Sequence, residues 1–183
     1  GDSDPLHLSD SDRLTLLAFP CYAVQRLKFA ASVGLKSTPG MLKQVGSSRE
    51  KTKDNDMNQP LRWGILGTGN IAAKFAAQLN ATDHGQLVAT GSRTLANATA
   101  FAGQHGGQGH GSYEQLVADP QVEAIYNSLP NSLHASWSIA GMQAGKHVLC
   151  EKPLAATTAE IEEMFATADA TGMKLMEAFM YRQ

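Results

Sequence analysis

The residues with the clearest chemical meaning form a short segment rich in small side chains, Gly67-Thr68-Gly69-Asn70-Ile71-Ala72. It follows an apolar run at 61–66 and opens a segment with helical spacing. In that context Gly67 permits a tight turn, Gly69 lets a ligand approach the backbone, and Ala72 lets the helix pack close to the strand. The start of a helix also offers free N–H groups and a positive dipole end to phosphate oxygens.

This pattern, G-x-G-x-x-A after a strand and before a helix, is the fingerprint of a dinucleotide-binding turn. A glycine-rich turn without a ligand is the alternative, and the strand–helix context favours the binding turn. We therefore expect the cofactor to be bound by Gly67, Thr68, Gly69, Asn70 and Ile71. The backbone at Gly69 would approach its pyrophosphate.

The end of the second predicted strand indicates which dinucleotide binds. NAD sites usually place Asp or Glu there, to bind the 2′-hydroxyl of the ribose. This chain has Gly91-Ser92-Arg93-Thr94 instead, without a carboxylate. Arg93 could form a planar, charge-assisted fork with a 2′-phosphate, and Ser92 could donate a further hydrogen bond. NADP is therefore expected in preference to NAD, and the alternative is that Arg93 is a solvated residue at a helix start.

These residues are positioned by segments in which strand and helix patterns alternate. Strands are expected at 61–66, 86–91, 122–129, 147–150 and 174–180. Helices are expected at 70–79, 95–104, 113–118, 132–144 and from Thr157 or Thr158 to about 172. The first helix has Ile71, Phe75 and Leu79 on one face. The repeated order predicts an α/β fold of the Rossmann type, a doubly wound and mainly parallel sheet with helices on both faces.

Two histidines, His105 and His110, lie on a glycine-rich stretch, and we interpret 106–111 as a surface loop. A metal site needs a set number of ligands in a fixed geometry, and no third ligand stands nearby in the sequence. No metal is therefore expected. Ser112 is a suitable cap for the helix at 113–118, and Asp119-Pro120 is a signal that ends it.

The composition changes near residue 57. Residues 36–60 are rich in Lys, Ser, Asp, Asn and Gly, which is typical of a linker or a disordered segment. One short amphipathic helix is expected around 22–33, with no second element on which it could pack. We therefore interpret residues 1–59 as a disordered N-terminal extension and residues 60–183 as an NAD(P)-binding Rossmann domain.

Charge and composition argue against several classes of function. The 15 Lys and Arg are balanced by 17 Asp and Glu, so nucleic-acid binding is not expected. No apolar run is long enough to cross a membrane. The apolar run at 14–24 resembles the core of a signal peptide, but acidic residues precede it where a signal needs basic ones. Because nothing supports a disulfide between Cys21 and Cys150, a cytoplasmic location is expected.

Two further segments with chemical potential follow predicted strands, Leu129-Pro130-Asn131-Ser132-Leu133-His134 and Glu151-Lys152-Pro153. Together with the glycine-rich segment, Ser92-Arg93 and the ending MEAFMYR, they occur in the order seen in the glucose–fructose oxidoreductase, inositol dehydrogenase and rhizopine catabolism (Gfo/Idh/MocA) family. Over residues 60–183 the chain resembles that family. Its ending resembles the dihydrodiol dehydrogenase and D-xylose dehydrogenase branch.

The resemblance implies an NAD(P)-dependent oxidoreductase that transfers a hydride between NADP and a hydroxyl group of a sugar or diol. Lys152 would lie at the carboxyl edge of the sheet, where ligands bind in doubly wound folds. If partly desolvated there, it would have a lowered pKa and act as the catalytic residue that passes a proton or polarises a carbonyl. A surface lysine is the alternative. Pro153 would fix the turn, and in the family the bond before it is often cis.

The remaining segment residues are expected to bind the cofactor. In the family the loop of Leu129, Pro130, Asn131 and His134 lines the nicotinamide ring, and Glu151 would orient Lys152 or hold cofactor hydroxyls. A packed or capping histidine is the alternative for His134.

The resemblance also implies a second α/β domain with a mostly antiparallel sheet, which would begin near Gln183 and carry the contacts to a small sugar or diol. This C-terminal domain is missing from the chain, so we expect a fragment, and any homo-oligomer would form through the missing domain. A dinucleotide-binding module without catalysis, or a truncated inactive fragment, is the alternative function.

Overall fold

The computed structural model describes residues 59–179. Cys21, the expected helix at 22–33 and nearly all of the expected extension at 1–59 lie outside the described residues. The described part holds six strands, which are β1 (Leu61–Leu66), β2 (Gly85–Gly91), β3 (Gln108–His110), β4 (Ala124–Asn127), β5 (His147–Glu151) and β6 (Leu175–Ala178). They form one sheet in the order β3-β2-β1-β4-β5-β6, and every neighbouring pair is parallel.

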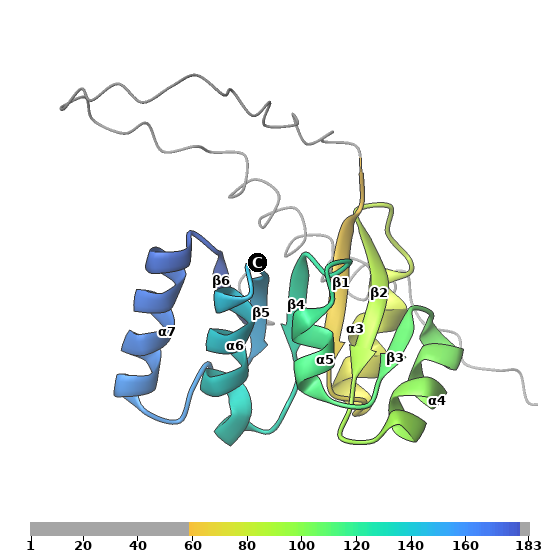
Figure 1. Cartoon of the computed structure of the whole chain (residues 1–183), viewed down its shortest axis with the longest axis horizontal. Coiled ribbons are helices and arrows are strands. Elements are labelled where there is room, and N and C mark those ends of the chain that lie inside the picture. Colours follow the sequence, from red (N-terminus) through yellow and green to blue (C-terminus); the bar gives the residue numbers. More distant parts are fainter. Residues whose placement is uncertain (1–58, 180–183) are drawn as a thin grey trace, which may run out of the picture.

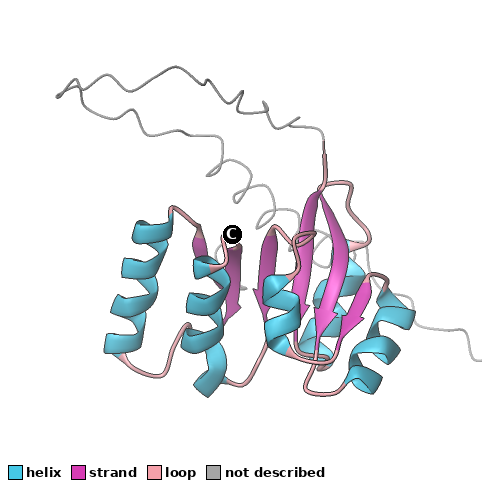
Figure 2. Cartoon of the chain, in the orientation of Figure 1, coloured by secondary structure: helices cyan, strands magenta, loops and turns pink. Residues whose placement is uncertain are grey.

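Helices cover both faces of this sheet, as Figures 1 and 2 show. They are α3 (Asn70–Leu79), α4 (Leu95–His105), α5 (Tyr113–Ala118), α6 (His134–Gln143) and α7 (Thr158–Thr171). Helices α3 and α4 pack on one face, with a core that includes Trp63, Leu79 and Phe101, and α5, α6 and α7 pack on the other. This is the doubly wound arrangement expected from the alternating pattern, so the predicted fold class is confirmed.

The strand order indicates at which edge of the sheet a ligand would bind, called here the ligand edge. The chain moves outward from β1 through β2 to β3, then returns to place β4 on the other side of β1. In such folds the crevice beyond the carboxyl ends of the strands, where the order reverses, is the usual ligand site. All six carboxyl ends point to the same side, which is the lower side in Figure 1.

Helix α3 has the predicted bounds but a different buried face. Ala72, Ala76 and Leu79 are fully buried, whereas Ile71 is 37% exposed. The expected face of Ile71, Phe75 and Leu79 was therefore wrong in part. The small alanines let the helix lie close to the sheet, and Phe75 packs at its margin by stacking on Tyr126 at 3.9 Å between ring centroids.

The stretch 106–111 was expected to be a loop and instead contains the edge strand β3, which pairs with β2. Its glycines permit close approach. Gly107 has a φ of +81°, and a Cβ there would lie 2.8 Å from the carbonyl carbon of Val88. A Cβ on Gly109 would lie 2.8 Å from the backbone of Ala98 in α4. Glycines occur here because β3 lies so close to β2 and to α4 that a side chain would not fit.

The single helix expected at 132–144 is divided. A 3-10 turn at Asn131–Leu133 precedes α6, which begins at His134. The predicted cap Ser112 accepts a hydrogen bond from the N–H of Gln115. Thr157 rather than Thr158 caps α7: its side chain accepts from the N–H of Glu160, and the carboxylate of Glu160 accepts from the N–H of Thr157. None of the helices in the described part of the chain has the length and apolar character that a membrane crossing requires.

Candidate functional site

The turn after β1 is fixed by the ends of two neighbouring strands. The N–H of Gly67 donates to the carbonyl of Gly91 at the end of β2, 2.9 Å away. On the other side, the N–H and hydroxyl of Ser128 both donate to the carbonyl of Leu66, at 3.2 and 2.7 Å. Gly67 has a φ of +99°, and a Cβ there would lie 3.1 Å from the Ser128 hydroxyl. Both conformation and space therefore require glycine at this position.

Gly69 is a glycine for which the described protein gives no steric reason. It precedes α3 with an ordinary φ of −81°, and a Cβ on it would meet no atom within 4 Å. Asn70 and Ile71, which open the helix, are exposed, and Thr68 is half-buried. The backbone here is thus open to solvent at the start of a helix, a position that is suited to bind phosphate groups in proteins.

The two residues expected to select NADP follow β2, and they differ in their exposure to solvent. Ser92 is 5% exposed, and its N–H donates to the carbonyl of His110 on β3. Arg93 is exposed, and the next residue, Thr94, caps α4 through a hydrogen bond from the N–H of Asn97. Arg93 therefore follows the carboxyl end of β2, next to the strand that leads into the glycine turn, while Ser92 is part of the strand pairing.

The side chain of Asn127, the last residue of β4, fixes the loop that follows this strand by hydrogen bonds. This buried side chain donates to the carbonyl of His134 and to the hydroxyl of Ser138, both at 3.1 Å, and accepts from the N–H of Leu129 at 3.3 Å. Leu129 is buried, whereas Pro130 and Asn131 are exposed at the sheet edge. Asn127 thus uses its amide fully to fix the path of a loop whose next residues face outward.

His134 connects this loop to the one after β5. The ring is 1% exposed, with Nε2 placed 2.8 Å from the carbonyl oxygen of Leu129 and Nδ1 placed 2.7 Å from that of Pro153. Both partners are acceptors, and the tautomer of the ring decides to which of them a neutral imidazole donates. The alternative of a packed histidine matches this placement. The ring is buried between the loop after β4 and the turn after β5. The expected contact between His134 and a cofactor stays a prediction.

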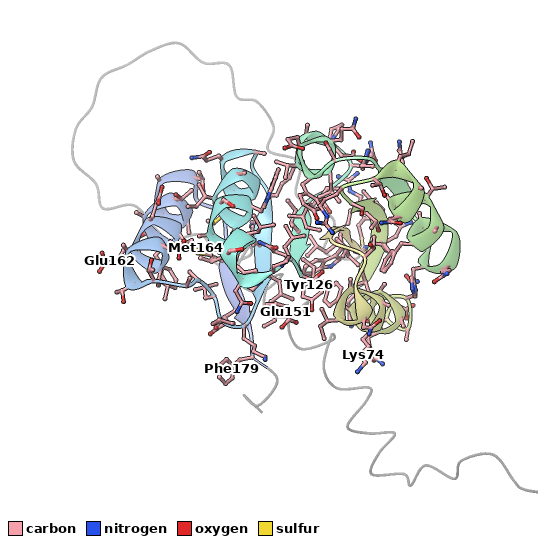
Figure 3. All side chains as sticks on the ribbon, turned by 90° about the horizontal axis from the view of Figure 1, so that it is seen from below. Lys74, Tyr126, Glu151, Glu162, Met164 and Phe179 are labelled. Atoms are coloured by element: carbon pink, nitrogen blue, oxygen red, sulfur yellow. The ribbon has the colours of Figure 1, made fainter. Side chains whose placement is uncertain are left out.

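Glu151 and Lys152 lie where β5 ends. One carboxylate oxygen of Glu151 accepts a hydrogen bond from the hydroxyl of Tyr126 on β4, and the other accepts from the N–H of Lys152 at 3.3 Å. Lys152 itself is exposed, and the Lys152-Pro153 peptide bond is cis. Figure 3 views this edge of the sheet and shows Tyr126 and Glu151 together on neighbouring strands. Both carboxylate oxygens of Glu151 are thereby engaged within the protein.

The structure therefore brings the glycine turn, Ser92-Arg93, the 129–131 loop and the Glu151-Lys152 turn to one edge of the sheet. The sequence prediction missed four side chains that hold these pieces, namely Tyr126, Asn127, Ser128 and Glu177. Glu177, on β6, accepts a hydrogen bond from the N–H of Leu154 in the turn after β5. A signal was present for Asn127, since it is a polar residue in an otherwise apolar strand. The others gain their partners only through strand pairing and contacts between segments distant in sequence.

Comparison with known proteins agrees with this geometry. The model of the Gfo/Idh/MocA oxidoreductases, an oxidoreductase family with an NAD-binding Rossmann fold, matches residues 61–179. The chain belongs to this family. The resemblance inferred from the motifs is confirmed.

Relatives within the Gfo/Idh/MocA family include enzymes of known reaction. D-xylose 1-dehydrogenase (NADP(+)) 2 of Haloferax volcanii is 44% identical over 124 residues, covering 67% of this chain and 38% of the relative. Trans-1,2-dihydrobenzene-1,2-diol dehydrogenase of Xenopus tropicalis is 40% identical over 125 residues, covering 66% of this chain and 38% of the relative. The chain thus spans less than two fifths of the length of these relatives.

A solved structure shows the same fold with a bound nucleotide. A 3-ketoreductase from Actinomadura kijaniata, in complex with NADP, matches with a TM-score of 0.63 and 37% identity, over 64% of this chain and 38% of that one. Family membership and the fold are therefore shown for residues 61–179.

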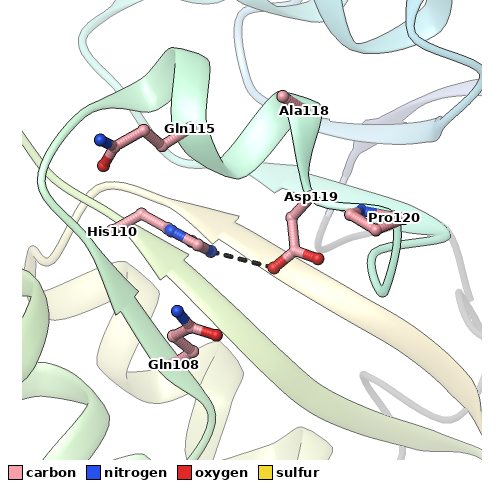
Figure 4. A pocket seen from close by; sticks show the side chains of 6 residues that line it. All are labelled: Gln108, His110, Gln115, Ala118, Asp119 and Pro120. Atoms are coloured by element: carbon pink, nitrogen blue, oxygen red, sulfur yellow. Dashed lines mark hydrogen bonds and ion pairs between the residues drawn. The ribbon is translucent and has the colours of Figure 1, made fainter.

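A hollow of this Gfo/Idh/MocA chain lies between β3 and α5 (Figure 4). Its lining includes Gln108, Gln115 and the pair formed by His110 and Asp119, whose Nε2 and carboxylate oxygen are 2.9 Å apart. It contains no residue of the glycine turn or the Lys152 turn. The partner of His110 was missed because Asp119-Pro120 was interpreted only as a helix stop.

Proposed function

We propose that this chain binds NADP and is the cofactor-binding part of an oxidoreductase that transfers a hydride between NADP and a hydroxyl-bearing carbon of a sugar or diol. The observation that carries the proposal is the open backbone at Gly69. It lies at a helix start and between strand ends, and nothing else in the described protein requires a glycine there. Family membership and the enzymes named among its relatives support the reaction class.

The residues present fit the cofactor. The N–H groups that open α3 would bind the pyrophosphate, with Thr68, Asn70 and Ile71 beside it. The exposed guanidinium of Arg93 would bind the 2′-phosphate in a bidentate manner, which favours NADP over NAD. Ser92, being buried, would contribute through the shape of the strand end.

The nicotinamide end would lie over the loops after β4 and β5. Bound NADP supplies the hydride acceptor, or the donor in the reverse direction, and the protein supplies position and a proton path. Pro130 and Asn131 would contact the ring from one loop. Lys152, on the other, would exchange a proton at its Nζ with the reacting hydroxyl or donate a hydrogen bond to the carbonyl oxygen.

Glu151 and His134 act in this proposal as supports. Glu151 already binds Tyr126 and the N–H of Lys152, so it orients the Lys152 turn. His134 binds the carbonyls of Leu129 and Pro153 and so fixes the separation of the two loops that would hold the nicotinamide. Direct contact of either side chain with NADP is the less favoured arrangement.

A pair of glycine variants tests cofactor binding. Gly69→Ala should lower the free energy of unfolding by no more than about 1 kcal/mol, because alanine is a poorer N-cap than glycine while the added Cβ meets open space. It should weaken NADPH binding, measured by fluorescence titration, at least about tenfold, because the Cβ occupies the space for the pyrophosphate. Gly103→Ala, on an open position of α4, is the matched control and should bind NADPH like wild type. Equal NADPH affinity in the Gly69 variant would argue against the site.

The reaction is tested by incubating the chain with NADP and a panel of aldoses and vicinal diols, and following the absorbance of NADPH. Hydride transfer that a Lys152→Met variant loses by about 100-fold or more, with NADPH affinity retained, is the expected result. NADPH binding without turnover of any substrate would instead favour the alternative, a dinucleotide-binding module without catalysis or a truncated inactive fragment.

A further inference from the structure

The turn at 152–154 is held by side chains that reach its backbone from three elements. Glu151 accepts from the N–H of Lys152, and His134 lies 2.7 Å from the carbonyl of Pro153. Leu154 is bound at both of its backbone groups, since its N–H donates to Glu177 at 2.9 Å and its carbonyl faces the thiol of Cys150 at 3.8 Å. Such a set of contacts restricts the backbone much more than a surface turn requires.

Glu177 is the member of this set that comes from the farthest point in the sequence. It lies on β6 in register with Cys150 of β5, and its Oε1 reaches the N–H of Leu154, 23 residues earlier in the chain. It is half-buried, next to a cluster of apolar side chains that includes Leu154 and Leu175. A carboxylate among apolar neighbours is costly unless it is hydrogen-bonded, so its presence needs a reason beyond packing.

The position of Glu177 links the edge strand to the Lys152 turn. A hydrogen bond from an N–H to a carboxylate is stronger than one between neutral groups, and it has a direction that apolar packing lacks. Two of the four side chains, Cys150 and Glu151, belong to β5, and His134 belongs to α6. Glu177 alone links the turn to β6. The turn thus cannot shift along β5 without breaking this bond.

We propose that Glu177 is a positioning residue for Lys152: by accepting the N–H of Leu154, it fixes the turn from which the Lys152 side chain extends toward the reacting centre. This inference rests on the proposed function of Lys152, and Glu177 itself touches neither cofactor nor substrate in it. A glutamine at 177 keeps an oxygen acceptor for the N–H, whereas a leucine of similar size does not.

The first measurement is amide hydrogen exchange at Leu154, followed by NMR. Glu177→Leu should exchange about tenfold faster at Leu154 than wild type, whereas Glu177→Gln should stay within about threefold. Glu162→Leu is the matched control, because Glu162 is exposed on α7 (Figure 3), and its exchange at Leu154 should equal that of wild type. Denaturant titration of each variant ensures that exchange is compared under conditions in which all are folded.

The second measurement concerns the Lys152 side chain and would not respond to a merely structural role of Glu177. The Cε signal of Lys152, assigned by its loss in Lys152→Arg, should shift on addition of NADPH in wild type and in Glu177→Gln. In Glu177→Leu the shift should fall to less than about half, while the affinity for NADPH, set at the glycine turn, changes less than about threefold. Rescue by glutamine identifies the hydrogen bond as the cause.

Failure of this proposal is distinguishable from failure of the proposed function. If wild type does not bind NADPH, the cofactor proposal is wrong. Leu154 exchange and the Lys152 signal of the free protein then still decide whether Glu177 fixes the turn. If Glu177→Leu has the exchange rate and the Lys152 signal of wild type, the positioning role is overturned.

Discussion

The hydroxyl of Tyr126 donates a hydrogen bond to a carboxylate oxygen of Glu151, and so joins β4 to β5 beneath the Lys152 turn. Burial, and then the hydrogen bond and charge of Glu151, raise the pKa of Tyr126 above its ordinary value. The hydroxyl therefore keeps its proton at neutral pH and remains a donor to the carboxylate. Its ring also stacks on Phe75 of α3, so one side chain contacts both the helix of the glycine turn and the strand of the lysine turn.

Replacement of this tyrosine should cost stability without altering the fold. Tyr126→Phe keeps the stacked ring but leaves one oxygen of Glu151 without its partner, and we expect the free energy of unfolding to fall by about 2 kcal/mol. Urea titration followed by circular dichroism gives the difference. Tyr113→Phe is the control, because its ring packs on Trp137 and its hydroxyl has no partner among residues 59–179. Equal losses in the two variants would contradict the importance of the Glu151 bond.

Arg93 should determine the preference between the two nicotinamide cofactors. Arg93→Ala is expected to raise the Kd for NADPH about tenfold or more and to leave that for NADH nearly unchanged, because only NADPH carries the 2′-phosphate that the guanidinium would bind. Competition titrations with both nucleotides measure this ratio. The wild-type preference should also weaken as salt concentration rises, since both charges are exposed to solvent.

Arg62→Ala provides the matched control for this test. Arg62 stands near the amino end of β1, away from the ligand edge, where it pairs with Glu123 at 3.2 Å. Its loss removes the same charge from the chain but no group near the cofactor. Equal effects of the two variants on NADPH affinity would indicate general electrostatic attraction rather than a 2′-phosphate site.

Local patterns were sufficient to predict five of the six strands in the described part of the chain, and the glycine turn. The bounds of α3 and the cap Ser112 follow from residue types within a few positions, and so does the placement of Lys152 after a strand. The cap of α7 was narrowed only to Thr157 or Thr158. The edge strand β3 was missed because three residues with a glycine among them carry no strand pattern, and their structure comes from pairing with β2. Tertiary contacts override local preference there.

The supports of the site could not be predicted for a similar reason. Glu177 and Leu154 are far apart in sequence, and their contact depends on the register of β5 with β6. His134 carried two alternatives in the sequence, a cofactor contact and a packed side chain. Only the positions of the carbonyls of Leu129 and Pro153 show what its two nitrogens face.

His147 should make the fold less stable in mild acid. Burial, and then the charge of Lys174, lower its pKa below the ordinary value of 6.5, and its Nδ1 accepts the N–H of Lys174, which joins β5 to the start of β6. As pH falls below 6.5 the unfolded chain takes up a proton that the folded one resists, so stability decreases through that window. In His147→Asn, whose side-chain oxygen can still accept, the slope of unfolding free energy against pH should be smaller. An unchanged slope would assign the effect to another group.

Asp119 should contribute stability that is lost only in stronger acid. Burial alone would raise its pKa, but the N–H of Gln121, the hydrogen bond and charge of His110 and the charge of Lys146 outweigh it, so the pKa lies below the ordinary 3.8. Its contribution is therefore complete above 3.8 and disappears as pH falls through the lower folded-state pKa. Asp119→Asn keeps the shape of the contact in Figure 4 but removes the charge.

Near neutral pH this variant should lose about 1 kcal/mol of unfolding free energy relative to wild type, because the charge of a half-buried hydrogen-bonded carboxylate is removed. The difference should shrink as pH falls below 3.8, where the wild-type carboxylate also becomes protonated. Urea titrations at a series of pH values measure both quantities. Because the pair lies on β3 and at the C-cap of α5, away from the glycine turn, NADPH affinity should stay at the wild-type value. A variant that lost affinity for NADPH together with stability would show that the two sites are coupled through β2 and β3.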